Sequence, residues 1–398
     1  MIPEPLVALD LPTLRHRTSM KWRTYPEDVL PLFVAETDFP LAPAISRALT
    51  LAVSLGDTGY IPPDSGLGDA YAGFAARRLG WQVDPARVRS TGDVMMGVVE
   101  ILRRVTSPGD RVVITPPVYP PFYDCIPEAG AQVQAVPLAS TGVGWELDLR
   151  GIEQALAGGA RAVLLCNPHN PTGTVHSREF LTQLAAIAAH HGAAVLSDEI
   201  HAPLALPGTT FTPFLSVSAD AAQVGYTLTS ASKAFNLAGL KCALMVTAAD
   251  GPSAVVQELP IEVEWRTGLF GAHAAIAGFS EASDPWLDSL LVALQQNHQL
   301  LKTLLAVHLP LARYRIPDAG FLAWVDLRGY DWGDNPARRI LREAKVAVNS
   351  GPTFGELGNG YIRINVGCSP DVLREAVQRI ANLGELPPPE LRKRRDLR

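Results

Sequence analysis

The chain has 398 residues, of which 47% are hydrophobic and 19% charged, and its formal net charge is −6 at pH 7. This balance is typical of a soluble globular protein, and the mild acidity argues against nucleic-acid binding, which usually requires a basic face. The length exceeds what one hydrophobic core usually spans, so we expect two closely associated domains.

The sequence predicts neither a signal peptide nor a membrane span. The first residues lack a basic segment followed by a long apolar one, and no apolar run approaches the length of a membrane helix. The four cysteines are scattered without a CxxC pair, which is typical of reduced thiols. We therefore expect a cytoplasmic protein.

From about residue 90, short β-rich apolar runs alternate with helical patterns, which predicts a mainly parallel sheet covered by helices. Residues 177–192 have the pattern of a crossover helix, with Ser177 as N-cap and Gly192 as its C-terminal stop. The expected strands cover residues 111–115, 132–138, 162–166, 193–197, 225–229 and 241–246.

Beyond Asp284 the pattern changes to a long helix that ends near Leu309, three strand-like segments at 321–328, 345–351 and 361–368, and a final helix at 371–384. This order is typical of an α+β domain. The predicted fold class is α/β, with a large domain whose mainly parallel sheet is sandwiched by helices and a smaller α+β domain. We expect the large domain at 45–284 and the small one at 1–44 and 285–398.

Polar clusters follow three of the predicted strands: NPHNPTG (167–173), DEIH (198–201) and SASK (230–233). Ligands bind at the carboxyl ends of such strands, although turn residues, a capping acid or a solvated lysine would explain each cluster taken alone. An amide, an acid and a lysine around one crevice suit a cofactor that has a phenolic oxygen, a ring nitrogen and an aldehyde. Pyridoxal 5'-phosphate (PLP) has all three groups.

The order NPxNPTG, DEIH and SxSKxFNxxG resembles the PLP-dependent fold-type I, class I/II aminotransferase family. Within it, DEIH followed by SKAFNLAG (232–239) is similar to the cystathionine β-lyase or C–S lyase branch, often labelled MalY/PatB. The resemblance extends from Lys21 and Trp22 through FVAETDFP (33–40) to YIRINVGC (361–368). It implies the PLP transferase fold type I.

The resemblance also implies roles for individual residues. Lys233 would be the Schiff-base lysine and the base that takes the Cα proton, and Asp198 would pair with the pyridinium nitrogen. Asn170 would bind the phenolic oxygen, and Tyr119 would stack on the ring. His201 stands where many aminotransferases have tyrosine, and it can still donate toward the cofactor oxygen.

The phosphate of the cofactor is expected where TGDVMMG opens a helix, on the backbone N–H groups of Val94 and Met95. Ser230, Ser232 and Lys241 would complete this cradle. Lys241 stands where many aminotransferases have arginine, and it can still neutralise phosphate as a point charge.

Two further residues follow from the resemblance. Tyr60 matches a tyrosine that reaches the phosphate of the neighbouring subunit, which implies a homodimer with shared sites, although alone it would be an ordinary loop aromatic. Arg363 matches the arginine that grips the substrate α-carboxylate, with Asn365 as a weaker neighbour.

The expected function is a PLP-dependent β-elimination that cleaves cystathionine or a related sulfur amino acid to a thiol, pyruvate and ammonia. An aminotransferase on the same fold stays open, because it would share the cofactor residues, and so does a regulatory protein that retains the fold. The expected partner is a small amino acid, with no nucleic acid and no membrane. Metal, P-loop and nucleophile-elbow motifs are not found in the sequence.

Overall fold

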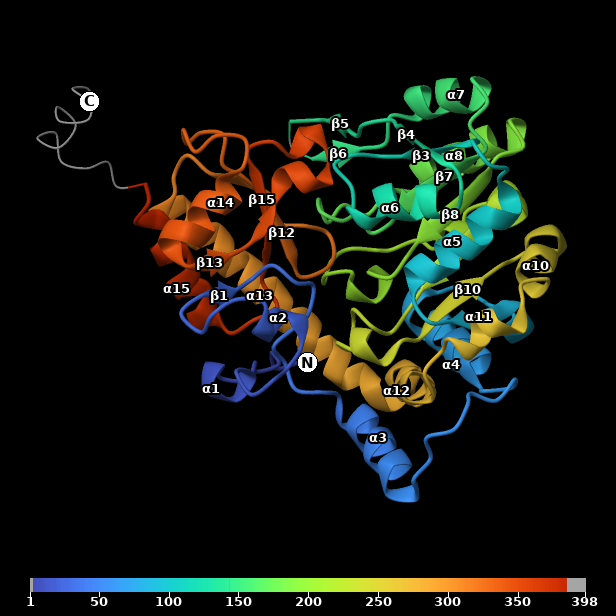
Figure 1. Cartoon of the computed structure of the whole chain (residues 1–398), viewed down its shortest axis with the longest axis horizontal. Coiled ribbons are helices and arrows are strands. Elements are labelled where there is room, and N and C mark those ends of the chain that lie inside the picture. The colour runs from blue at the N-terminus through green and yellow to red at the C-terminus, as the bar shows by residue number, and fades with distance from the viewer. Residues whose placement is uncertain (1–2, 143, 385–398) are drawn as a thin grey trace, which may run out of the picture.

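The computed structural model describes residues 3–142 and 144–384, and a seven-stranded sheet forms its centre (Figure 1). The strands from β9 to β4 are parallel, whereas β10 runs antiparallel to both of its neighbours. The predicted mainly parallel sheet is thus confirmed, and its unpredicted member is β2. The spatial order is β2 (Val88–Thr91), β10 (Ala243–Val246), β9 (Gly225–Thr229), β8 (Ala194–Asp198), β7 (Ala162–Cys166), β3 (Arg111–Ile114) and β4 (Gln132–Ala135).

Helices cover both faces of this sheet. One face packs against α5 (Val94–Val105), α6 (Pro121–Glu128), α10 (Asp250–Gln257) and α11 (Ile261–Trp265). The other face packs against α4 (Leu67–Phe74), α7 (Leu149–Ala157), α8 (Arg178–His190), α9 (Ala219–Val224) and α12 (Leu269–Phe279). Helix α3 (Pro43–Leu55) packs on α12. Alternate side chains of β7 enter the two resulting cores, which is why the whole strand is apolar.

The crossover helix α8 begins as its sequence predicts. Ser177 is the N-cap, and its hydroxyl accepts a hydrogen bond from the backbone N–H of Phe180 at 3.3 Å. Beyond the helix, Gly192 has φ of +60°, a left-handed conformation that glycine adopts without strain. Local sequence therefore fixes both ends of the helix that joins β7 to β8.

The C-terminal part contains a four-stranded antiparallel sheet, with α13 (Asp284–His308) and α15 (Pro370–Ala381) packed against each other. The strand expected at 345–351 is two short strands, β13 and β14, because β13 leaves the sheet to pair with β1. This part also holds α14 (Pro336–Arg339). The sheet order is β11 (Arg313–Tyr314), β12 (Leu322–Asp326), β15 (Tyr361–Asn365) and β14 (Asn349–Ser350); β13 (Val346–Ala347) pairs with β1 (Leu30–Pro31), and β5 (Ala139–Ser140) pairs with β6 (Trp145–Glu146).

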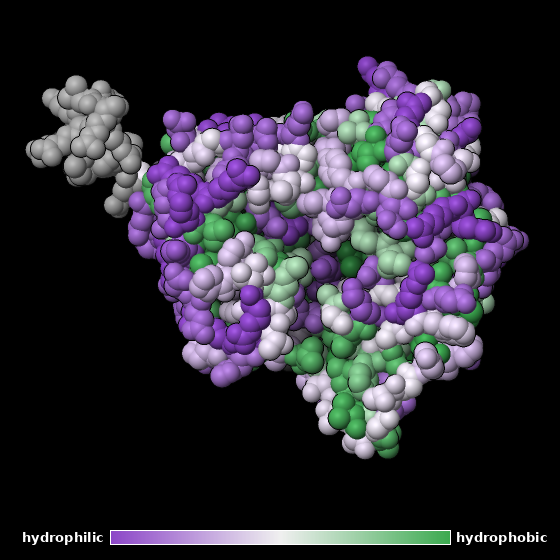
Figure 2. All heavy atoms as spheres, viewed as in Figure 1, coloured by the Kyte–Doolittle hydropathy of each residue, from purple (hydrophilic) through white to green (hydrophobic). Residues whose placement is uncertain are grey.

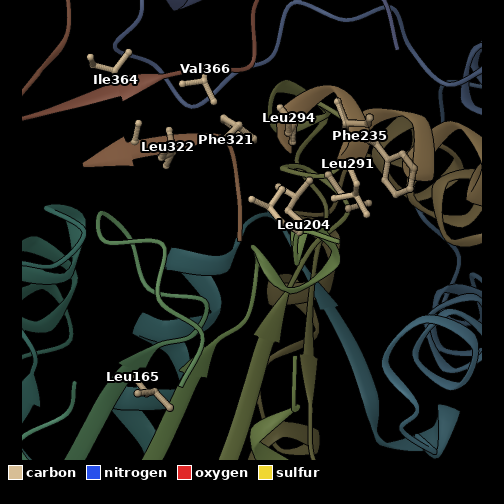
Figure 3. Close-up of a cluster of buried hydrophobic side chains, with 14 of the residues drawn as sticks. Leu165, Leu204, Phe235, Leu291, Leu294, Phe321, Leu322, Ile364 and Val366 are labelled. Carbon is tan, nitrogen blue, oxygen red and sulfur yellow. The ribbon is translucent and has the colours of Figure 1, made fainter. Parts of the chain in front are cut away.

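One hydrophobic core joins the two parts of the chain (Figure 3). Leu322 of β12 and the preceding Phe321 lie in the same buried cluster as Leu291 of α13 and Phe235, which follows β9. The C-terminal sheet is therefore held close to the carboxyl ends of the parallel strands. Within 3–142 and 144–384, no helix has the length and apolar character of a membrane span.

An N-terminal segment, which we call the strap (residues 30–38), runs between these two parts after α1 (Leu11–Leu14) and α2 (Met20–Arg23). The side-chain amide of Asn365 donates to two strap carbonyls, those of Val34 at 2.6 Å and Glu36 at 2.7 Å. A buried ion pair between Lys21 and Asp38, 2.6 Å long, fixes the end of the strap. The space-filling view shows a hollow between the two parts of the chain (Figure 2).

Candidate active site

A cavity of about 240 Å³ opens at the carboxyl ends of the parallel strands. The three polar clusters that follow β7, β8 and β9 contribute Asn170, Asp198 and Lys233 to its wall, and the strap contributes Ala35. Its position agrees with the rule that α/β sheets bind ligands at this edge. Further predicted site residues that line it are Val94, Met95, Tyr119, His201, Ser230, Ser232 and Lys241.

Lys233 projects its amine toward the strap, where Nζ donates to the carbonyl oxygen of Ala35 at 3.3 Å. Burial, together with the nearby positive charge of Arg363, lowers the pKa of this amine to about 8. A substantial fraction of the amine is therefore neutral near pH 8. A neutral buried amine can attack an aldehyde or accept a proton.

Asp198 ends β8 as a buried carboxylate, and its one hydrogen bond in the described part of the chain comes from the backbone N–H of Ile200 at 3.1 Å. Burial raises its pKa to about 7, and Lys233 opposes this shift. No ion pair to Asp198 exists within 3–142 and 144–384. A buried carboxylate usually needs a cationic partner, so this position fits a protonated ring nitrogen.

Arg363 of β15 is a buried guanidinium that faces neutral groups. Nη1 donates to Oδ1 of Asn170 at 2.9 Å, and Nη2 donates to Oδ1 of Asn349 at 2.6 Å and to the carbonyl of Phe33 at 3.2 Å. Its Nε has no hydrogen-bond partner among the described residues, and burial lowers the pKa of the guanidinium to about 10. The ring of Phe354 lies 5.0 Å from the guanidinium carbon. This arrangement is suited to an incoming carboxylate.

The amide of Asn170 is oriented by this contact with Arg363. Because its Oδ1 accepts from the guanidinium, its Nδ2 is left to donate into the cavity. His201 is also buried, and its Nδ1 has no partner in the part of the chain that the structure describes. Burial lowers the pKa of the imidazole to about 3, so the ring is neutral. The amide of Asn170 is thus available to donate to an oxygen on a bound ring, as the phenolic oxygen of PLP would require, and His201 lines the same cavity.

Tyr119 follows β3 and forms another wall of the cavity, with burial raising its pKa to about 12. Its ring meets that of Phe122 edge to face, with the centroids 6.0 Å apart. One face of the phenol can therefore remain available to a planar ligand.

The end of the cavity at which the phosphate is expected lies at the start of α5, where the N–H groups of Val94 and Met95 have no helical acceptor. The hydroxyl of Ser230 donates to the carbonyl of Cys242 at 2.6 Å, so it supports the loop as well as lining the cavity. Lys241 follows a short turn with φ of +57°, and its strand begins only at Ala243.

Two predicted residues lie elsewhere. Tyr60 is 88% exposed and does not line the cavity within its own chain, so it can serve a phosphate only in a second subunit. Asn365 binds the strap carbonyls and accepts from the N–H of Gly367 at 2.7 Å, so it positions the strap.

The contributors that sequence reasoning missed include Ala35, Asp93, Asn349 and Phe354. Asp93 is the N-cap of α5, and an aspartate directly before a helical pattern is an N-cap signal that the sequence contains. Ala35 contacts Lys233 across 198 residues of sequence, and local pattern carries no signal for such a contact. Asn349 and Phe354 are close to Arg363 in the sequence, but they lie outside the motifs that carry the resemblance.

The aminotransferase class I and II family model matches residues 34–380. The chain belongs to this family. Among its family relatives, a Mycobacterium leprae protein assigned as a cystathionine beta-lyase is 42% identical over 96% of this chain and 98% of its own length. The cystathionine beta-lyase of Corynebacterium glutamicum is 36% identical over 94% and 99%.

A crystal structure from Corynebacterium diphtheriae, of a family protein assigned as a PLP-dependent beta-cystathionase, superposes with a TM-score of 0.90. The two sequences are 36% identical, and the match covers 95% of this chain and 98% of the other. The expected PLP transferase fold type I and the expected family branch are therefore confirmed.

Proposed function

We propose that this protein is a PLP-dependent C–S β-lyase that cleaves cystathionine or a related sulfur amino acid to a thiol, pyruvate and ammonia. The observation that carries the proposal is the meeting of Lys233, Asp198 and Arg363 at one cavity in a chain whose relatives are named for this reaction. The amine, the acid and the guanidinium come from different parts of the fold.

The residues of the cavity fit PLP. Lys233 would hold it covalently, Asp198 would keep its ring nitrogen protonated, and Asn170 and His201 would bind its phenolic oxygen. Tyr119 would stack on the ring. The phosphate would be held by Val94, Met95, Ser230, Ser232 and Lys241. When bound, the cofactor supplies an electron sink that stabilises negative charge at the substrate Cα.

The chain itself supplies orientation and proton transfer. Arg363 would bind the substrate α-carboxylate with its fork of donors, because Asn170 and Asn349 fix the guanidinium plane. The amine of Lys233, with its pKa lowered to about 8, would take the Cα proton. The strap, held over the amine, would exclude water from the reacting carbon.

We also propose a homodimer with shared sites. Tyr60 is exposed, and the preceding helix α3 exposes Leu51, Val53 and Leu55 on an apolar surface (Figure 2). A second copy would cover this surface, and Tyr60 of the first copy would then reach the phosphate end of the cavity in the second copy.

The four cysteines are free and buried, which supports a cytoplasmic location. The proposed domains remain 45–284, and 1–44 with 285–398, of which residues 1–2, 143 and 385–398 lie outside the described part.

Product analysis tests the proposed function. Incubation of the purified holoenzyme with L-cystathionine should release pyruvate and a free thiol in equal amounts, with no need for a keto acid. Stoichiometric conversion of PLP to pyridoxamine phosphate, with amino transfer to an added keto acid, would instead establish the aminotransferase. Partner capture unaffected by Lys233→Ala would favour a regulatory protein.

A further inference from the structure

The phosphate end of the cavity contains an acidic side chain that the proposed chemistry does not use. Asp93 is the N-cap of α5, and its Oδ1 accepts from the backbone N–H of Met96 at 2.9 Å. Its Oδ2 pairs with Nζ of Lys241 at 3.1 Å. Both side chains line the cavity, so the lysine has a carboxylate partner before any phosphate arrives.

The charges at this end of the cavity therefore nearly cancel. A phosphate ester carries up to two negative charges, and the other groups that face it are backbone N–H groups and serine hydroxyls. The side chains of Asp93 and Lys241 are 41% and 59% exposed, so solvent screens their interactions only in part. A phosphate must share Lys241 with Asp93 and lie near a like charge.

Capping of α5 does not require this charge. Asparagine and serine cap helices about as well as aspartate does, because each offers an acceptor to the same backbone N–H. A substitution can therefore remove the negative charge of Asp93 and keep its hydrogen-bond acceptor. A neutral cap would keep the bond to Met96 and leave Lys241 free for the phosphate.

We propose that Asp93 weakens the binding of the PLP phosphate, both by competing for Lys241 and by repelling the anion. The inference rests on the proposed function, because it requires the phosphate at the start of α5. Its consequence is that the protein exchanges its cofactor more readily than it would with an uncharged cap.

The test compares two ligands that differ only in the phosphate. The full-length protein, freed of cofactor, is titrated with PLP and with pyridoxal, and binding is followed by absorbance. In Asp93→Asn and Asp93→Ser, the dissociation constant of PLP should fall about tenfold, the size of one partly screened charge interaction. The dissociation constant of pyridoxal should not change, and inorganic phosphate should compete more strongly with PLP in both variants.

Asp250→Asn is the matched control. Asp250 lies in the first turn of α10, is 96% exposed and pairs with Arg87 at 2.6 Å, away from the cavity. The substitution Asp250→Asn removes one negative charge, as Asp93→Asn does, and should leave the dissociation constants of PLP and of pyridoxal unchanged.

Equal PLP affinities in the wild type and Asp93→Asn would overturn the inference while leaving the proposed function intact. An equal gain for pyridoxal, or for Asp250→Asn, would also overturn it. Failure of the wild-type protein to bind PLP at Lys233 would overturn the proposed function, and this inference with it.

Discussion

Nη1 of Arg363 donates to Oδ1 of Asn170 at 2.9 Å, which joins the C-terminal sheet to the loop that follows β7. The residue proposed to bind the substrate carboxylate thereby orients the amide proposed to bind the cofactor. The packing of the C-terminal part against the parallel sheet aligns both groups at once. The carboxylate site and the ring site are one structural unit.

Replacement of Arg363 should affect substrate binding more than cofactor binding. We expect Arg363→Ala to raise the KM for L-cystathionine about a hundredfold, since a buried charge-assisted bidentate contact is lost. The absorbance of bound PLP should remain. Arg313→Ala, on the exposed strand β11, is the control and should behave as wild type. Loss of the bound-cofactor absorbance in Arg363→Ala would assign the arginine a structural role.

Reduction with borohydride should fix the cofactor to one peptide. The buried amine of Lys233 is held beside Ala35 at the cavity wall, whereas the amine of Lys241 is engaged with Asp93. Mass spectrometry of the reduced, digested protein should place the label on Lys233 alone. Lys233→Ala should abolish both the label and the visible absorbance, and a label on Lys241 in the wild type would contradict the assignment.

Asp198→Asn should retain the shape of the site and lose its charge. Without a carboxylate the ring nitrogen has no anionic partner, so we expect kcat to fall about a thousandfold, as for other lost electrostatic contacts at reacting groups. Circular dichroism should show an unchanged fold. Activity within tenfold of the wild type would mean that another group protonates the ring.

The sequence predicted the parallel sheet and the positions of Asn170, Asp198 and Lys233, because each follows an apolar strand whose carboxyl end must lie at one edge. It did not predict β2 or the split between β13 and β14. β2 and β13 are short, and each pairs with a remote segment, β2 with β10 and β13 with β1. The sequence also did not predict the contacts of the strap, because they are made by backbone carbonyls, which residues of every type have.

The ion pair between Lys21 and Asp38 should contribute strongly to stability when one member alone is removed. Both side chains are almost fully buried, and Nζ of Lys21 also donates to the carbonyl of Glu36 at 3.2 Å. Lys21→Met would leave a buried carboxylate unpaired, which should lower the free energy of unfolding by about 3–5 kcal/mol. Urea unfolding measures this change.

The double variant Lys21→Met with Asp38→Leu provides the control for that prediction. It removes both charges and keeps apolar volume, so it should recover much of the lost stability. A double variant as unstable as Lys21→Met would show that the side-chain shapes, and not the unpaired charge, determine the loss.

His298 of α13 should make the protein less stable in mild acid. Its Nδ1 accepts from the hydroxyl of Tyr314 at 2.6 Å, and its Nε2–H donates to the carbonyl of Gly320 at 3.0 Å. Burial lowers its pKa to about 4 from 6.5. The unfolded chain therefore binds the proton first as the pH falls below 6.5, and stability decreases until the pH approaches 4.

The difference between the wild type and His298→Gln isolates this effect. The raised pKa values of Asp198 and Glu199, about 7 and about 8, act on stability with the opposite sign and cancel in the comparison. His298→Gln should be less stable at pH 7.5, because it fits the two hydrogen bonds less well. Its deficit should shrink by about 2 kcal/mol at pH 5, where only the wild type carries the cost of a neutral buried imidazole. Urea unfolding at the two pH values measures this change, and a deficit that stays constant would show that the imidazole titrates alike in the folded and unfolded chains.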